Sequence, residues 1–127
     1  MRTLLFILLA TSLAACSTPP PQHITGTWVS TFDGTVLDLM SDDADHSNGI
    51  FVVQPSASDV PPFTGQFRAT QTDVTLAEDA GGPCATMAGQ YEFALLDDVL
   101  LMTLKHDECT MRSDIMEYAW TRSLSSE

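Results

Sequence analysis

Eight short runs of β-forming residues follow one another between residues 26 and 124, with turn residues between them, and this succession limits the fold more than any other feature. Apolar and polar side chains alternate in several runs, as over residues 89–93. Because successive side chains of a strand point to opposite faces, this alternation is typical of a sheet with one packed face and one partly wet face. The predicted strands are Gly26–Phe32, Thr35–Met40, Gly49–Gln54, Phe63–Thr70, Asp73–Ala77, Ala88–Leu95, Val99–Lys105 and Glu117–Leu124.

Turn signals between these runs favour antiparallel neighbours. Asp33-Gly34 predicts a tight hairpin between the first two strands, because glycine accepts the positive φ that such turns require. Asp97-Asp98 predicts another short turn, and Thr110–Ile115 is the helical candidate, one turn long. We therefore expect an all-β domain, an eight-stranded antiparallel up-and-down barrel, since closure removes the two exposed edges that an open sheet would have.

Residues 1–15 have the pattern of a secretory signal. Arg2 supplies a positive charge, and the apolar run over residues 4–9 is far shorter than the ~20 residues of a membrane-spanning helix. The sequence LAAC, which ends at Cys16, resembles the lipobox of bacterial lipoproteins. That resemblance implies cleavage before Cys16 and lipid chains, such as palmitate, on this cysteine. The alternative is a plain signal peptide in which a cysteine stands at this position by chance.

The lipoprotein resemblance also implies a location and a domain organisation. Two or more acyl chains hold a protein stably on a membrane. Ser17 stands where an aspartate often retains lipoproteins in the inner membrane, so we expect an outer-membrane protein that faces the periplasm. The predicted organisation is a signal peptide over residues 1–15, a lipidated cysteine and proline-rich tether over 16–24, and a barrel domain over 25–127.

Two of the three cysteines remain once Cys16 is assigned to lipid. Cys84 and Cys109 would then share an oxidising compartment, where a disulfide between them closes a loop of about 26 residues and contributes roughly 3 kcal/mol. Two unpaired buried thiols are the alternative. We expect no metal site on these cysteines, because no C-x-x-C or H-x-x-x-H spacing accompanies them.

The chain is strongly acidic. It carries 17 acidic and 5 basic residues, a formal net charge of −12 at pH 7. Nucleic acids and anionic lipid surfaces are poor partners for such a charge. Solubility is one explanation of the acidity, and attraction of a basic protein or of cations is the other.

Residues on the first and the last predicted strand resemble those of lipocalins and related calycin barrels. The tripeptide GTW, from Gly26 to Trp28, looks like the G-x-W of that family, and Arg122 looks like the arginine that packs across its tryptophan. The stretches CATMAGQYEF and DECTMRSDIMEYAWTR look like the tail of small bacterial lipocalin-like lipoproteins. The resemblance implies that Gly26, Trp28 and Arg122 close one barrel end, by cation–π stacking. The chain departs from the family in its short length and in its lack of a Thr-Asp-Tyr loop and a long C-terminal helix. An ordinary β-sandwich core is the alternative.

No segment has the pattern of a catalytic or metal site. The acidic stretch over residues 41–49 lacks the glycine and the glutamate that a calcium loop of the EF-hand type needs. Asp97 and Asp98 lie in a predicted turn that is exposed to water, so we expect ordinary ionised side chains there and not a catalytic pair of carboxylates. His106, Asp107 and Glu108 are adjacent at a strand end, so their side chains would point in different directions and would not form a three-ligand metal site. No G-x-S-x-G motif is present in the sequence. We expect neither enzymatic activity nor a cofactor.

Two classes of function are compatible with these features. In the first, a lipocalin-like barrel holds a small apolar ligand, with Phe32, Tyr91, Phe93 and Met102 inside it. In the second, an acidic surface docks a protein, as an inhibitor of a basic periplasmic enzyme such as a lysozyme would, or as a structural component of the envelope. The volume inside the barrel discriminates between them, because a filled barrel leaves only its surface for binding.

Overall fold

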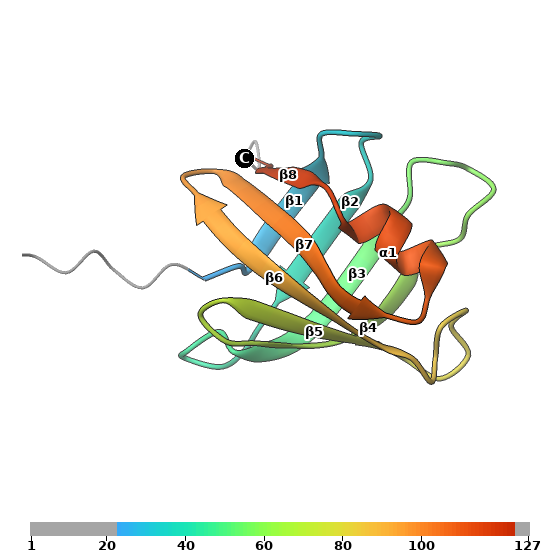
Figure 1. Ribbon diagram of the computed structural model, residues 1–127, viewed down its shortest axis with the longest axis horizontal. Helices are drawn as coiled ribbons and strands as arrows, with labels where there is room; N and C mark the ends of the chain where they lie inside the picture. Colours follow the sequence, from blue (N-terminus) through green and yellow to red (C-terminus); the bar gives the residue numbers. More distant parts are fainter. Residues whose placement is uncertain (1–22, 124–127) are drawn as a thin grey trace, which may run out of the picture.

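The computed structural model describes residues 23–123, which form a closed barrel of eight antiparallel strands in chain order (Figure 1). The strands are β1 (Gly26–Ser30), β2 (Val36–Met40), β3 (Asn48–Gln54), β4 (Phe63–Ala69), β5 (Asp73–Glu78), β6 (Ala88–Leu96), β7 (Val99–Asp107) and β8 (Ala119–Arg122), and helix α1 (Thr110–Met116) precedes β8. The prediction of an all-β, eight-stranded antiparallel barrel is confirmed. The predicted signal peptide, Cys16 and most of the predicted tether lie outside the described residues.

Strand β1 ends earlier than predicted, and this changes the position of Phe32. The Gly34 N–H donates to the Ser30 carbonyl at 3.1 Å, and the Ser30 N–H donates to the Thr35 carbonyl at 2.8 Å. These bonds close a turn over residues 31–34, in which Gly34 has a φ of 80°. Phe32 lies on this turn with 68% of its surface exposed, so its prediction as an interior residue is wrong.

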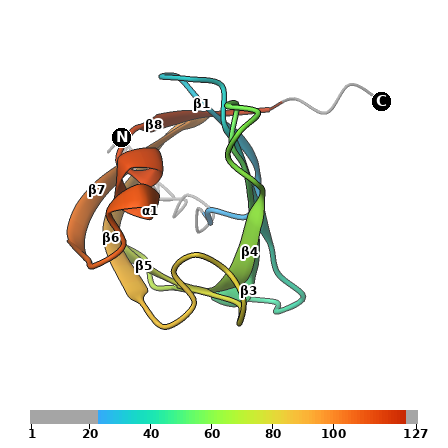
Figure 2. The same ribbon diagram turned by 90° about the vertical axis from the view of Figure 1, so that its right-hand side faces the viewer.

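Strands β1 and β8 close the barrel, with Trp28 opposite Arg122. Helix α1 leads from β7 into β8 at one end of the barrel, the end that faces the viewer in Figure 2. It ends where the Glu117 N–H donates to the Ser113 carbonyl at 3.1 Å, so β8 begins later than predicted. Within residues 23–123, no helix has the length and apolar character needed to cross a bilayer.

Large apolar side chains fill the inside of the barrel. They form one core of buried residues: Ile24, Trp28, Leu37, Leu39, Phe51, Val53, Phe63, Phe67, Val74, Leu76, Tyr91, Leu100, Met102, Met116 and Trp120. Two phenyl rings reach over interior glycines, because a Cβ at Gly65 would lie 2.6 Å from the Phe51 ring and one at Gly49 would lie 2.8 Å from the Phe67 ring. Ile24, at the end of the predicted tether, is 1% exposed and belongs to this core.

Candidate functional site

The four side chains predicted to hold a ligand do not come together around an internal space. Tyr91 and Met102 are buried parts of the core, and Phe93 packs against the core from a partly buried position. Phe32 lies outside, on the β1–β2 turn. Two hollows stand out in the described chain, and they lie on the outer wall and at one end of the barrel.

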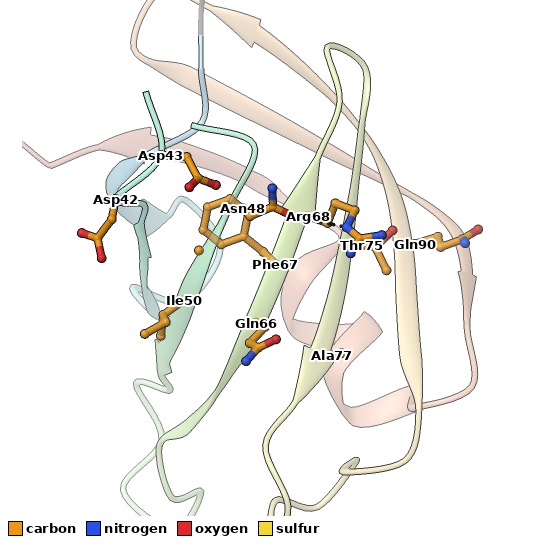
Figure 3. A pocket seen from close by; sticks show the side chains of 11 residues that line it. Asp42, Asp43, Asn48, Ile50, Gln66, Phe67, Arg68, Thr75, Ala77 and Gln90 are labelled. Carbon is orange, nitrogen blue, oxygen red and sulfur yellow. Dashed lines mark hydrogen bonds between the residues drawn. The ribbon is translucent and has the colours of Figure 1, made fainter. Parts of the chain in front are cut away.

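The larger hollow is a groove of about 660 Å³ on the outer wall, which we call the outer groove (Figure 3). Cross-strand register builds it. Ile50 of β3 lies opposite Gln66 of β4, which lies opposite Ala77 of β5. The next row of pairs runs from Asn48 through Arg68 and Thr75 to Gln90, and ends on β6. The small side chains of Thr75 and Ala77 leave a depression in the outer wall between the longer side chains of the neighbouring strands.

Polar groups and two exposed apolar side chains, Ile50 and Ala77, line the outer groove. Asp42 and Asp43, from the loop after β2, stand on one side of it (Figure 3). The Arg68 Nε donates to the Asn48 Oδ1 at 3.3 Å, which holds the guanidinium along the wall. Ile50 is 52% exposed. The Asp42 and Asp43 carboxylates can attract basic groups to this side of the groove, while Arg68 places one cation on its wall.

Trp28 and Arg122 meet at the end of the barrel where the described chain begins. The guanidinium carbon lies 4.3 Å from the centroid of the indole ring, and the Arg122 Nη1 donates to the Thr25 carbonyl at 3.1 Å. The Trp28 Nε1 donates to the Ile24 carbonyl at 2.8 Å. Gly26 has a φ of 137°, and a Cβ there would lie 2.5 Å from the Arg122 Nη1. The three residues predicted to close the barrel therefore contact one another at this end.

A smaller hollow of about 360 Å³ lies at the same end. Two stacked imidazoles border it, those of His23 and His46, with ring centroids 3.8 Å apart. The Thr25 hydroxyl lies 2.9 Å from one Nδ1 and 3.2 Å from the other. Desolvation, the neighbouring His46 and Arg122 lower the pKa of His23. Phe93 also lines this hollow. Of the four residues predicted to bind a ligand, it is the one that borders either of the two hollows.

The opposite end of the barrel holds a buried ionic cluster that the sequence did not reveal. Arg112, on α1, donates through Nε and Nη2 to the two carboxylate oxygens of Asp107, each at 2.7 Å. Its Nη2 also donates to the Met87 carbonyl at 2.8 Å, and its Nη1 lies 3.7 Å from the Glu78 Oε1. The Tyr91 hydroxyl donates to Asp107. The side chains of Arg112, Asp107 and Glu78 are fully buried.

Charge pairing decides the ionisation of this cluster. Burial alone would raise the pKa of Asp107, but hydrogen bonds from Arg112, Tyr91 and the Cys109 N–H outweigh it and lower that pKa. Burial and the bond to Asp107 raise the pKa of Tyr91. For Arg112, burial acts against the charge, but Asp107 outweighs it and raises the pKa. Asp107 and Arg112 are therefore an ion pair at neutral pH, beside a neutral phenol.

A disulfide lies directly against this cluster. The sulfur atoms of Cys84 and Cys109 are at bonding distance, and their Cα atoms lie 5.9 Å apart. The Cys84 N–H donates to the Glu78 Oε2 at 3.0 Å, and the Cys109 N–H donates to the Asp107 Oδ1 at 2.9 Å. The covalent bond and the ionic cluster thus fasten the β5–β6 loop and α1 to the barrel, which is a structural role.

The other acidic groups singled out in the sequence lie apart from one another. Asp97 has a φ of 55° in the tight β6–β7 turn, and the Asp98 Oδ1 lies 3.6 Å from the Arg122 Nε. Asp42 and Asp43 line the outer groove, whereas Asp107 belongs to the buried cluster at the opposite end.

No protein-family model matches the chain, and neither a curated protein nor a solved structure is significantly similar to it. The function must therefore be inferred from the geometry of the barrel itself.

Proposed function

We propose that the protein is a non-enzymatic, lipid-anchored lipoprotein of the bacterial envelope that works through its outer wall, as a docking module for a basic protein. The filled interior carries this proposal. Fifteen buried apolar residues form one continuous core, so a binding partner has only the outside of the barrel to contact. The lipobox-like sequence before Cys16 supports the anchor, at the outer membrane and facing the periplasm.

The outer groove is the proposed docking site. Among the described residues, 16 acidic and four basic side chains are present. Arg112 is buried with its two acidic partners, while Lys105 pairs with Asp73 at 3.1 Å. The remaining surface therefore attracts a basic protein over a distance, and the groove offers it a shaped contact. Inhibition of a basic periplasmic enzyme is one form that such docking takes.

Photo-crosslinking from Gln66, in the full-length protein in its native envelope, tests the docking site. We expect a covalent product with a basic protein. The double variant Asp42→Asn/Asp43→Asn should reduce its yield several-fold, because two carboxylates beside the groove are lost. The matched control Asp33→Asn/Asp59→Asn removes the same charge from loops at the α1 end and should leave the yield unchanged. Equal losses in both variants would reduce the proposal to a general effect of charge, and no product would exclude it.

Replacement of Cys16 tests the anchor separately. Cys16→Ser should yield an unprocessed or soluble protein, because the thiol that receives the lipid is missing. The measurement is the fraction of the protein that sediments with membranes. A variant that stays membrane-bound at the wild-type level contradicts lipid attachment at Cys16, whatever the groove binds.

The small hollow beside Phe93 favours one second candidate, the binding of a small apolar ligand at the barrel end. Its volume of about 360 Å³ is at the lower limit of usual ligand sites. Native mass spectrometry of the protein, extracted from its membrane without added ligand, would detect an added mass. Phe93→Asp should abolish that added mass, and its persistence in this variant would exclude the hollow as the ligand site.

A further inference from the structure

The outer wall has a second distinctive region, on the side of the barrel opposite to the outer groove. Val99 of β7 lies opposite Thr121 of β8, which lies opposite Val29 of β1. In the next row, Leu101 of β7 lies between Ala94 of β6 and Ala119 of β8. We call these six residues the uncharged face. In the closed ring of eight strands, β8 is four strands away from β4, the middle of the groove wall, in either direction.

Exposed apolar side chains extend the uncharged face toward both ends of the barrel. Leu96, at the β6–β7 turn, is 60% exposed. At the other end, Phe32 is 68% exposed, and its ring stacks on that of Tyr118 with centroids 4.5 Å apart. Leu101 lies between them and is itself exposed. Exposed apolar residues that line up along one wall mark an interaction surface, whereas scattered ones are ordinary.

Charged residues border this face but do not enter it. The Asp98–Arg122 pair lies at one edge, and Glu92 lies on β6 beyond Ala94. Elsewhere on the described chain, acidic side chains outnumber basic ones by 16 to four. Two copies of such a chain repel each other along every acidic surface, and this repulsion is weakest where the uncharged faces meet.

We propose that the uncharged face is the contact between two copies of this chain. A basic partner is attracted to the acidic surfaces, whereas an equally acidic copy is best accommodated where neither surface has charge. The barrel is closed, so two copies cannot join by adding strands at an edge, and the contact is between the outer faces of two sheets. A dimer with twofold symmetry would bury Leu101 of one copy against the same wall of the other.

Crosslinking and a charge variant, both in the full-length lipoprotein, test this inference. A photo-crosslinking amino acid in place of Leu101 should give a covalent dimer in the envelope, and the same group in place of Ile50, in the outer groove, should not. Sedimentation of the detergent-solubilised protein should show a dimer. Leu101→Asp should raise the dissociation constant of the dimer by at least about tenfold, because two carboxylates would be buried in the contact. Ile50→Asp is the matched control and should leave the dimer unchanged.

Every other outcome overturns the inference. A monomer in solution, a crosslink from position 101 to lipid or to a different protein, or a dimer that Ile50→Asp weakens and Leu101→Asp does not, would each show that another occupant covers this face. Because the groove and the uncharged face lie on opposite walls, loss of the dimer leaves the groove experiment unaffected, so the two proposals fail independently.

Discussion

The two ends of the barrel each use an arginine, but in opposite surroundings. Arg122 stacks on an indole, with 31% of its side chain exposed. Arg112 is completely buried and bound to carboxylates. A guanidinium near water gains a modest stacking energy and keeps part of its hydration, whereas a buried one has exchanged its hydration for ionic partners. The end that holds Arg112 should therefore tolerate the loss of its arginine far less.

Arg112→Met is the largest expected effect. The variant removes a buried cation and leaves Asp107 and Glu78 without their partner, which should lower the free energy of unfolding by about 3–5 kcal/mol. Urea denaturation at pH 7 measures this loss. Arg68→Met on the outer wall is the control and should change the stability by less than about 1 kcal/mol. A loss as small as that in Arg112→Met would show that the cluster relaxes or takes up water.

The disulfide should contribute somewhat less than the ionic cluster beside it. The double variant Cys84→Ala/Cys109→Ala should lose about 3 kcal/mol, because the unfolded chain regains the entropy of an open loop. A reductant should destabilise the wild type by a similar amount and leave the double variant unchanged. If the reductant has the same effect on both proteins, the covalent bond is not what fastens this end.

The pair at the other end should show a smaller coupling. In a double-mutant cycle, Arg122→Ala and Trp28→Ala should be coupled by about 0.5–2 kcal/mol, and the double variant should be less damaged than the sum of the singles predicts. The free energies come from the same urea titrations. Strict additivity would mean that the guanidinium and the ring make no energetic contact, in spite of their distance of 4.3 Å.

The smallest expected effect is on the pH dependence of the stability, which should differ between the two ends. The lowered pKa of His23 means that the unfolded chain binds its proton more readily, so stability should decline as the pH falls below about 6.5. For Asp107, whose pKa is also lowered, stability is fully present above about pH 4 and is lost below it. His23→Gln should remove only the first decline in a series of thermal unfolding curves. A decline near pH 6 that persists in this variant must originate elsewhere.

The strands and turns were predictable because they are encoded locally. Alternation within a run identifies its inner face, and Asp33-Gly34 identifies the first turn, although the alternation continued to Phe32 and did not show that the turn begins at residue 31. Trp28 and Arg122 were identified through a family resemblance, and they lie opposite each other on the neighbouring strands β1 and β8.

The buried cluster and the two outer faces could not be predicted in this way. Arg112 and Asp107 are close in sequence, but Glu78 and Tyr91 reach them only through the pairing of β5, β6 and β7. A signal was present, since an arginine is a costly residue on a helix whose neighbours, such as Met116, are buried. The groove and the uncharged face depend on which residues of neighbouring strands lie opposite one another, and alternation within one strand identifies the face of a residue but not its cross-strand partner.

The described chain enters and leaves the barrel at the same end. Arg122 lies opposite Trp28, and the Ser123 N–H donates to the Thr27 carbonyl at 2.8 Å. A reporter fused beyond Ser123 would therefore be attached at the end where the N-terminal anchor is proposed. It would leave the outer groove, the uncharged face and the α1 end accessible. An epitope inserted into the exposed loop over residues 55–62 would instead label the far end. The chain thus offers an attachment point at each end of the barrel, and comparing the accessibility of the two labels would measure how the barrel is oriented relative to the membrane.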